Sequence, residues 1–282
     1  MKRSSLNVAA ALASALALAA TANAQSGPRD LLVTPTRIVF EGRLRAAEVT
    51  LVNTGSATAT YRISFVNLRM NEAGGTREIE TAGAEPGELF ADSLIRYSPR
   101  QVTLEPKMVQ TVRLQVRLPA DLPAGEYRSH LLFRAVPAAA LPAKSSDLSK
   151  GFSVELTPIY GISIPVIVRH GETSAAATLS ALDLVPPAEA GAPPTLHFRI
   201  GRTGNRSVYG NFTATFVPAG GQPSVVGIVK GVALYTPNSV RSAELVLRMP
   251  PGVSLENGRL HLAYTKQEKG NETLAEADLI VR

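Results

Sequence analysis

Histidines are the residues of this chain that could most directly support catalytic or metal chemistry, and their spacing argues against both. The sequence has four histidines, which lie far apart and show no H-x₃-H or HExxH spacing: His130, His170, His197 and His261. It has no cysteine, which excludes disulfides, thiol catalysis and cysteine-bound metals. It also has no GxSxG, P-loop or GxGxxG motif. We therefore predict that the chain is not an enzyme and needs no cofactor or metal.

Arg37 is a cation in an otherwise strand-like stretch, TPTRIVFEG, at residues 34–42. Strand alternation places Ile38 and Phe40 on one face, and Arg37 and Val39 on the other. A guanidinium has a planar fork of donors that can hold both oxygens of a carboxylate. Taken alone, the stretch favours an exposed arginine in an ordinary surface ion pair, with an anion site as the alternative.

The first 24 residues have the features of a secretory signal peptide. Lys2 and Arg3 precede an apolar run at residues 8–20, and an AxA cleavage site follows at residues 22–24. No later segment approaches the ~20 apolar residues of a membrane-spanning helix. We expect an exported mature chain without membrane insertion.

The formal charge of the mature chain is +4 rather than +6, because the leader carries two basic residues. The basic residues are scattered, which argues against nucleic acid as a partner.

Short β-rich runs separated by Gly, Pro and Asn turns recur along the whole mature chain. In one of them, Val112, Leu114 and Val116 alternate with Arg113 and Gln115. No long helical period follows the leader. The number of such runs predicts an all-β fold of two tandem immunoglobulin-like β-sandwiches. A weak internal repeat and a composition change near residues 170–171 predict one domain at residues 25–170 and a second at 171–282.

The segment from residue 152 to residue 168 alternates over ~17 residues, whereas strands usually have five or six. Its even positions are almost all apolar. One interpretation is an unpaired edge strand that adds to the sheet of another chain, with Phe152, Val154 and Leu156 as apolar knobs. The alternative is two core strands joined by a kink between Pro158 and Gly161.

Several stretches in a fixed order resemble the PapD-like periplasmic chaperones of the chaperone–usher pathway. A lysine that the family has and this chain lacks, described below, indicates a divergent branch. The resemblance covers most of residues 31–170 and continues more weakly to the end. It rests on these stretches: TPTRIVFEG, VTLVNTG, YSPRQVTLEPKMVQTVRL, LPADLPAGEYRSHLLFRAVP and a strand ending in SIPVIVR. It implies two immunoglobulin-like domains set in an L with a cleft between them, and a periplasmic location. The implied partners are pilus or fimbrial subunits, capped by donor-strand complementation, and an outer-membrane usher. The sequence leaves open whether two free copies pair with each other through the edge strand.

The resemblance also assigns roles to individual residues. Arg37 falls where family members bind the C-terminal carboxylate of the subunit. The family's second anchor, a lysine near the end of the long strand, is missing at residues 162–165, and Arg128 is the candidate replacement. A further set of charged residues is expected to join the two domains in an ion network: Glu126, Arg169 and Glu256.

A second class of function remains open from the sequence. An exported tandem immunoglobulin-like protein could be structural or adhesive and lack chaperone activity. A chaperone needs an unpaired apolar strand and a cation aligned with its end, whereas an adhesin would carry its binding residues on loops at the tip of a sandwich.

Overall fold

The computed structural model describes residues 30–137, 159–187, 189, 191–267 and 272–282, and strands dominate these parts of the chain. The only helical elements in them are two short 3₁₀ turns, η1 (Thr81–Gly83) and η2 (Asp92–Leu94). The prediction of an all-β fold is confirmed. No helix in the described ranges is long and apolar enough to cross a membrane.

The first sandwich consists of two sheets. Its strands are β1 (Leu31–Thr34), β2 (Ile38–Phe40), β3 (Ala46–Asn53), β4 (Ala59–Met70), β5 (Thr76–Ile79), β6 (Ile95–Ser98), β7 (Gln101–Leu104), β8 (Val109–Val116), β9 (Gly125–Val136) and β10 (Gly161–His170). One sheet has the order β1-β3-β8-β6, and the other β2-β10-β9-β4-β5 with β7 beside β4. The first order and the run β10-β9-β4 match the ABED and GFC sheets of an immunoglobulin domain.

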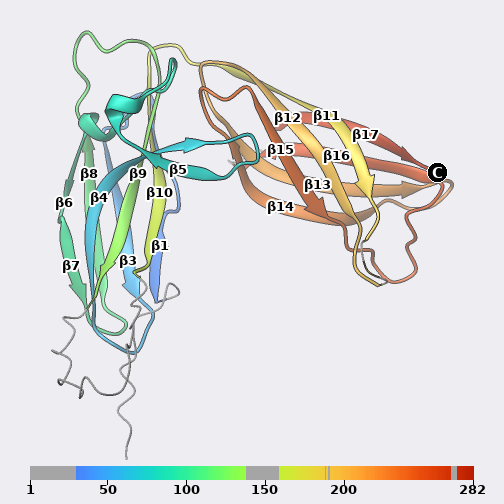
Figure 1. Cartoon of the computed structure of the whole chain (residues 1–282), viewed down its shortest axis with the longest axis horizontal. Coiled ribbons are helices and arrows are strands. Elements are labelled where there is room, and N and C mark those ends of the chain that lie inside the picture. Colours follow the sequence, from blue (N-terminus) through green and yellow to red (C-terminus); the bar gives the residue numbers. More distant parts are fainter. Residues whose placement is uncertain (1–29, 138–158, 188, 190, 268–271) are drawn as a thin grey trace, which may run out of the picture.

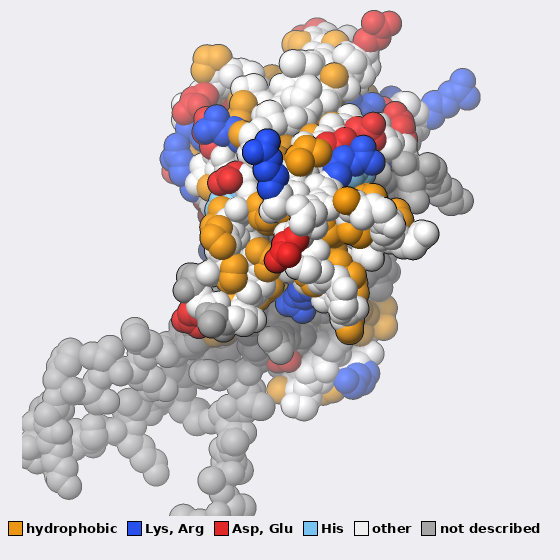
Figure 2. Space-filling view, turned by 90° about the vertical axis from the view of Figure 1, so that its right-hand side faces the viewer, with side chains coloured by type: hydrophobic (Ala, Val, Ile, Leu, Met, Phe, Trp, Pro, Cys, Tyr) orange, Lys and Arg blue, Asp and Glu red, His pale blue; other side chains and the backbone are white. Residues whose placement is uncertain are grey.

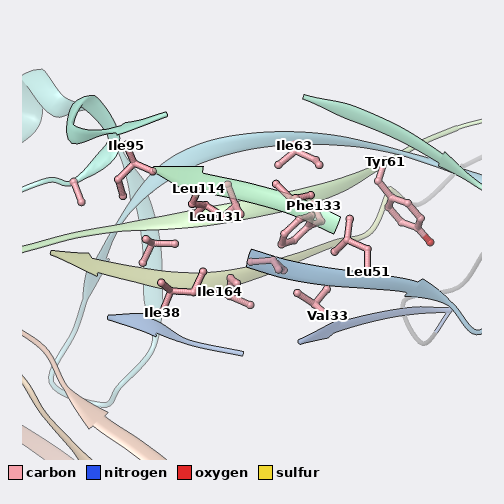
Figure 3. Close-up of a cluster of buried hydrophobic side chains, with 14 of the residues drawn as sticks. Val33, Ile38, Leu51, Tyr61, Ile63, Ile95, Leu114, Leu131, Phe133 and Ile164 are labelled. Carbon is pink, nitrogen blue, oxygen red and sulfur yellow. The ribbon is translucent and has the colours of Figure 1, made fainter. Parts of the chain in front are cut away.

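Alternating side chains from both sheets fill the core of this sandwich. Leu114 on β8 and Leu131, Phe133 and Phe40 on the opposite sheet are almost wholly buried. Figure 3 shows several of these side chains between the two sheets. Each contributes ~1.5–3 kcal/mol by leaving water. The polar residues that alternate with Leu114 point outward, as the sequence pattern predicts.

The second sandwich also has two sheets. Its strands are β11 (Ala175–Val185), β12 (Thr195–Gly204), β13 (Val208–Pro218), β14 (Ser224–Leu234), β15 (Val240–Val246), β16 (Gly258–Lys266) and β17 (Thr273–Val281). The sheet orders are β11-β12-β15 and β14-β13-β16-β17. In its separate core, the rings of Phe212 and Tyr264 stack with centroids 4.3 Å apart. The two tandem immunoglobulin-like sandwiches of the prediction are therefore present.

The chain passes from one sandwich to the other between β10 and β11. No strand pairing joins the two sandwiches in the described parts of the chain. Gly171 has φ +65, and a Cβ there would lie 2.6 Å from that of Ala124, so a larger residue would be strained. The two sandwiches meet at a steep angle and form an L (Figure 1).

The long apolar segment is only partly visible in the structure. β10 pairs with β9 along its whole length, whereas β2 covers its other side only from Val166 to Val168. Its edge over residues 161–165 has no strand partner among the described residues. Ile164, Val166 and Val168 point into the core of the first sandwich, so this half is a core strand. The expected knobs Phe152, Val154 and Leu156 lie outside the described residues, and their role stays a prediction.

Candidate interdomain anion site

Arg37 lies where the first strand of the fold changes sheets. β1 pairs with β3 in one sheet, and β2 pairs in parallel with β10 in the other. Ile38 and Phe40 are buried in the core, so the predicted alternation is confirmed. Val39, on the other face, packs against a small apolar cluster that both domains form. Arg37 lies immediately before β2 and is half-buried at the domain junction.

Arg128 lies on the same sheet, two strands away from Arg37. It pairs with Ile167 of β10, which in turn pairs with Val39 of β2, so these three residues form a row across the sheet. The expectation that the strand of Arg128 lies beside the long strand is therefore confirmed. Arg128 is only 6% exposed. Its Nη2 donates to the carbonyl of Leu68 at 3.0 Å, whereas Nε and Nη1 have no acceptor among the described residues.

Two tyrosines from the second domain cover the two arginines. The guanidinium carbon of Arg37 lies 4.3 Å from the ring centroid of Tyr209 and 5.7 Å from that of Tyr235. The guanidinium of Arg128 lies 4.0 Å from the ring of Tyr235. Nη1 of Arg37 also donates to the hydroxyl of Tyr235 at 3.4 Å. These are cation–π contacts, which attract a cation without neutralising it.

His130 completes this group, two residues after Arg128 on β9. It is buried, and its ring lies edge-on to that of Tyr235 with centroids 6.3 Å apart. Burial lowers the pKa of His130 to about 3, with smaller contributions from the nearby Arg128 and Arg37. The imidazole is therefore neutral at pH 7, and the positive charge belongs to the two arginines. We call Arg37, Arg128, His130, Tyr209 and Tyr235 the interdomain arginine site.

The interdomain arginine site has an excess of positive charge. Neither Arg37 nor Arg128 forms an ion pair with an acidic side chain in the described parts of the chain. No described acidic side chain supplies the surface ion pair that the sequence alone favours for Arg37. Burial lowers the pKa of the Arg128 guanidinium, but an arginine remains charged in proteins. A buried cation with two unsatisfied donor nitrogens favours an anion that can accept from them.

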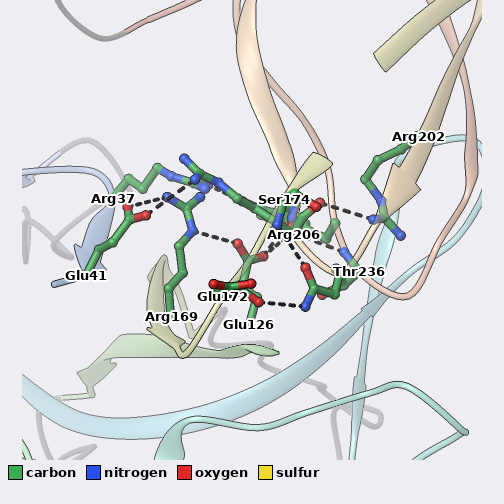
Figure 4. Close-up of polar contacts among 12 residues, drawn as sticks. Arg37, Glu41, Glu126, Arg169, Glu172, Ser174, Arg202, Arg206 and Thr236 are labelled. Atoms are coloured by element: carbon green, nitrogen blue, oxygen red, sulfur yellow. Dashed lines mark hydrogen bonds and ion pairs between the residues drawn. The ribbon is translucent and has the colours of Figure 1, made fainter. Parts of the chain in front are cut away.

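An ion network lies beside this site and joins the two domains (Figure 4). Arg169, at the end of β10, donates to Glu126 at 3.0 Å and to Glu41 at 2.9 Å. Glu41 also lies 3.3 Å from Arg206 of the second domain. The buried carboxylate of Glu126 accepts from the backbone N–H of Ser207 at 3.1 Å and from its hydroxyl.

Glu256 is absent from this network, so its place in the expected set is wrong. β16 is antiparallel to β13, and Gly258 pairs with Pro218, at the end of β13 remote from Ser207. The loop that carries Glu256 therefore lies at the far end of the second sandwich. Glu41, which sequence reasoning missed, supplies the second carboxylate. It lies four residues after Arg37 in the same TPTRIVFEG stretch, and this proximity was the available signal.

Two more segments of the first domain touch the second. At the tip of the β4–β5 hairpin, the carbonyl of Glu72 accepts from the backbone N–H of Ser242 at 2.7 Å. The carbonyl of Met70 accepts from Nδ2 of Asn238 at 2.9 Å. Figure 1 shows this hairpin reaching from the first sandwich toward β15. The second domain is thus held by the ion network, the arginine site and the hairpin.

The face of the molecule shown in Figure 2 has a mixed surface. Basic and acidic side chains are interspersed there with hydrophobic ones, and no continuous basic stripe is visible. This distribution agrees with the scattered charges of the sequence.

Comparisons with known proteins find similarity in structure only. No protein-family model matches the sequence, and no curated protein matches it significantly. The structure is similar to the YadV chaperone, at 11% identity and a TM-score of 0.45, covering 89% of this chain and 100% of the other. It is similar to a chain of the CsuC–CsuE chaperone–tip subunit complex of Acinetobacter baumannii, at 12% identity and a TM-score of 0.42, covering 89% and 97%. It is also similar to the CupB2 chaperone of Pseudomonas aeruginosa, at 12% identity and a TM-score of 0.41, covering 89% and 100%.

Proposed function

We propose that this protein is a periplasmic chaperone that binds pilus or fimbrial subunits, caps them and delivers them to an outer-membrane usher. The observation that carries this proposal is the interdomain arginine site. It combines two arginines at a junction that both domains form, and neither has an acidic partner among the described residues. One of them, Arg128, is buried, and two of its nitrogens lack an acceptor there. The ligand chemistry that suits it is a carboxylate, such as the one at the end of a polypeptide.

Arg37 is the residue that first meets this carboxylate. It is half-exposed, whereas Arg128 is almost wholly covered by Tyr235 and by the backbone around Leu68. Arg37 therefore makes the direct contact, and Arg128 adds positive potential behind it, or donates directly once Tyr235 shifts. In this proposal, Arg128 on β9 supplies the positive charge that a lysine on the long strand supplies in the family.

The free edge of β10 leads away from this anchor. Over residues 161–165 it offers backbone groups on the side that β2 leaves uncovered. A subunit that lacks a strand could pair there, continuing along the knobs Phe152, Val154 and Leu156. The carboxylate contact would set the register, since a slip of one residue turns every side chain to the opposite face.

The test is a periplasmic pull-down of the tagged protein from its native host, with bound proteins identified by mass spectrometry. We expect the wild type to recover small exported β-rich proteins with an alternating apolar C-terminal segment. Arg37→Ala should recover roughly 10- to 100-fold less, as expected for loss of a charge-assisted contact of ~1.5–3 kcal/mol. The matched control is Arg96→Ala, which removes an exposed arginine from β6 in the opposite sheet.

Three outcomes would weaken the proposal in different ways. Equal recovery by the wild type and Arg37→Ala would leave a chaperone without this carboxylate anchor. An equal loss for Arg96→Ala would indicate a general charge effect. Recovery of no such subunit by the wild type would favour the structural or adhesive alternative.

A further inference from the structure

Tyr235, which belongs to the second domain, contacts both guanidiniums of the interdomain arginine site, which the first domain supplies. Its ring faces Arg128 at 4.0 Å, and its hydroxyl accepts from Arg37. Tyr209, also from the second domain, stacks on Arg37 at 4.3 Å. The site is therefore composite, because one domain supplies the cations and the other supplies the surfaces that hold them.

An aromatic ring holds an arginine differently from an acidic side chain. A ring covers the flat face of the guanidinium, whereas its N–H groups donate in the plane of the group. Stacking therefore leaves donors available for a bidentate carboxylate. Arg169 in the same molecule shows the opposite arrangement, since Glu126 and Glu41 occupy its Nε and Nη1.

The backbone next to Tyr235 is tied to the ion network. The N–H of Thr236 donates to the hydroxyl oxygen of Ser207 at 3.1 Å, and that hydroxyl donates to Glu126. Glu126 is in turn bonded to Arg169. The position of Tyr235 over Arg128 therefore depends on the second domain being docked against the first.

We infer that Tyr235 and Tyr209 are the positioning residues of this anion site, so that carboxylate capture requires the docked second domain. The inference rests on the proposed function and adds to it. The rings hold two like charges in place, and Nε and Nη1 of Arg128 keep no acceptor among the described residues. Without the two tyrosine rings, Arg37 would be an isolated surface cation. It would then bind a peptide with a C-terminal carboxylate only slightly better than the same peptide with a C-terminal amide.

The experiment uses the mature full-length protein and a defined probe, acetyl-Gly-Gly-Phe, compared with its C-terminal amide. Binding is followed by NMR titration of the arginine Nε–H resonances. We expect the wild type to prefer the acid over the amide. Tyr235→Leu should reduce this acid-to-amide preference roughly 3- to 30-fold, in line with loss of a desolvated cation–π contact. Tyr235→Phe should retain most of it because the ring remains, and Tyr209→Leu should have an intermediate effect.

The matched control is Tyr97→Leu, since the ring of Tyr97 stacks on Arg100 at 4.5 Å in a different sheet. That variant should keep the wild-type preference. The inference is overturned if Tyr235→Leu keeps the preference while Arg37→Ala loses it, because the rings would then only pack. It is also overturned if the wild type shows no preference. If the wild type prefers the acid over the amide but recovers no subunit in the pull-down, the chaperone proposal is contradicted, whereas the inference about the interdomain arginine site stands.

Discussion

The arginines at the domain junction differ in their partners. Arg169 is neutralised by two carboxylates and supports the structure, whereas Arg37 and Arg128 stack on rings and keep their charge available. His130 lies two residues beyond Arg128 on β9, and its Nδ1 has no hydrogen-bond partner among the described residues. Its neutral form is what the site tolerates, because a third buried cation would repel the other two.

Acid should destabilise the protein through His130. The pKa of His130 is about 3 in the folded chain, whereas an ordinary histidine, as in the unfolded chain, has a pKa of 6.5. Between pH 3 and pH 6.5, only the unfolded chain takes up a proton at this residue. The stability is fully present above pH 6.5 and falls as the pH drops toward 3. Between pH 7 and pH 5 we expect a loss of about 2 kcal/mol that the His130→Leu variant lacks.

Urea unfolding of both proteins at pH 7 and pH 5 measures this difference. The other histidines are present in both proteins, so their contributions cancel. Glu41 does not interfere, because Arg169 and Arg206 outweigh the effect of burial and hold its pKa below the usual 4.5. Parallel losses in the two proteins would show that His130 takes up a proton in the folded state.

The β4–β5 hairpin is one of the elements that hold the two sandwiches together. Its tip contains Gly74 at φ +84, and a Cβ there would lie 2.4 Å from the guanidinium of Arg241 in the second domain. The tip also forms the backbone hydrogen bond from Ser242 to Glu72. A glycine is needed at this turn for both its backbone conformation and its close approach.

Gly74→Ala should loosen this contact. We expect the Ser242 amide to exchange with solvent at least several-fold faster, measured by hydrogen–deuterium exchange. Gly42→Ala is the control, since Gly42 has φ +62 but no atom within 4 Å of an added Cβ. Both variants should lose roughly 1 kcal/mol from backbone strain. An unchanged Ser242 amide in Gly74→Ala would mean that Arg241 moves aside and the hairpin stays docked.

The whole molecule is two separate cores held in an L by a small polar junction. Each sandwich has its own apolar cluster, and the apolar cluster shared between them is small. The buried carboxylate of Glu126 is central to the junction because it accepts from both Arg169 and Ser207. The angle between the domains therefore depends on few contacts, while each sandwich has an apolar core of its own.

Glu126→Gln should change the shape of the molecule more than its cores. We expect a loss of roughly 1–3 kcal/mol at the junction and a larger radius of gyration in small-angle X-ray scattering. Glu48→Gln is the control, because the Glu48–Arg113 pair is exposed and such pairs contribute ~0–1 kcal/mol. If Glu126→Gln keeps the wild-type scattering curve, the hairpin and the arginine site suffice to hold the angle.

The sequence by itself determined the strands and the faces of their side chains. The alternation in TPTRIVFEG placed Ile38 and Phe40 in the core and Arg37 on the opposite face, because neighbouring residues of a strand must point to opposite sides. The turns between short alternating runs predicted two sandwiches. Resemblance to a family, rather than local pattern, drew attention to Arg128.

Only the tertiary structure decided what surrounds these residues. Tyr235 lies 198 positions from Arg37, and no local pattern links them. Glu41 rather than Glu256 joins the ion network because strand order places the loop of Glu256 at the far end of its sandwich. Contacts between the domains depend on how the two folded sandwiches pack against each other. Strand periodicity predicts on which face of a strand a residue lies, but it does not predict which residues of the other domain contact that face.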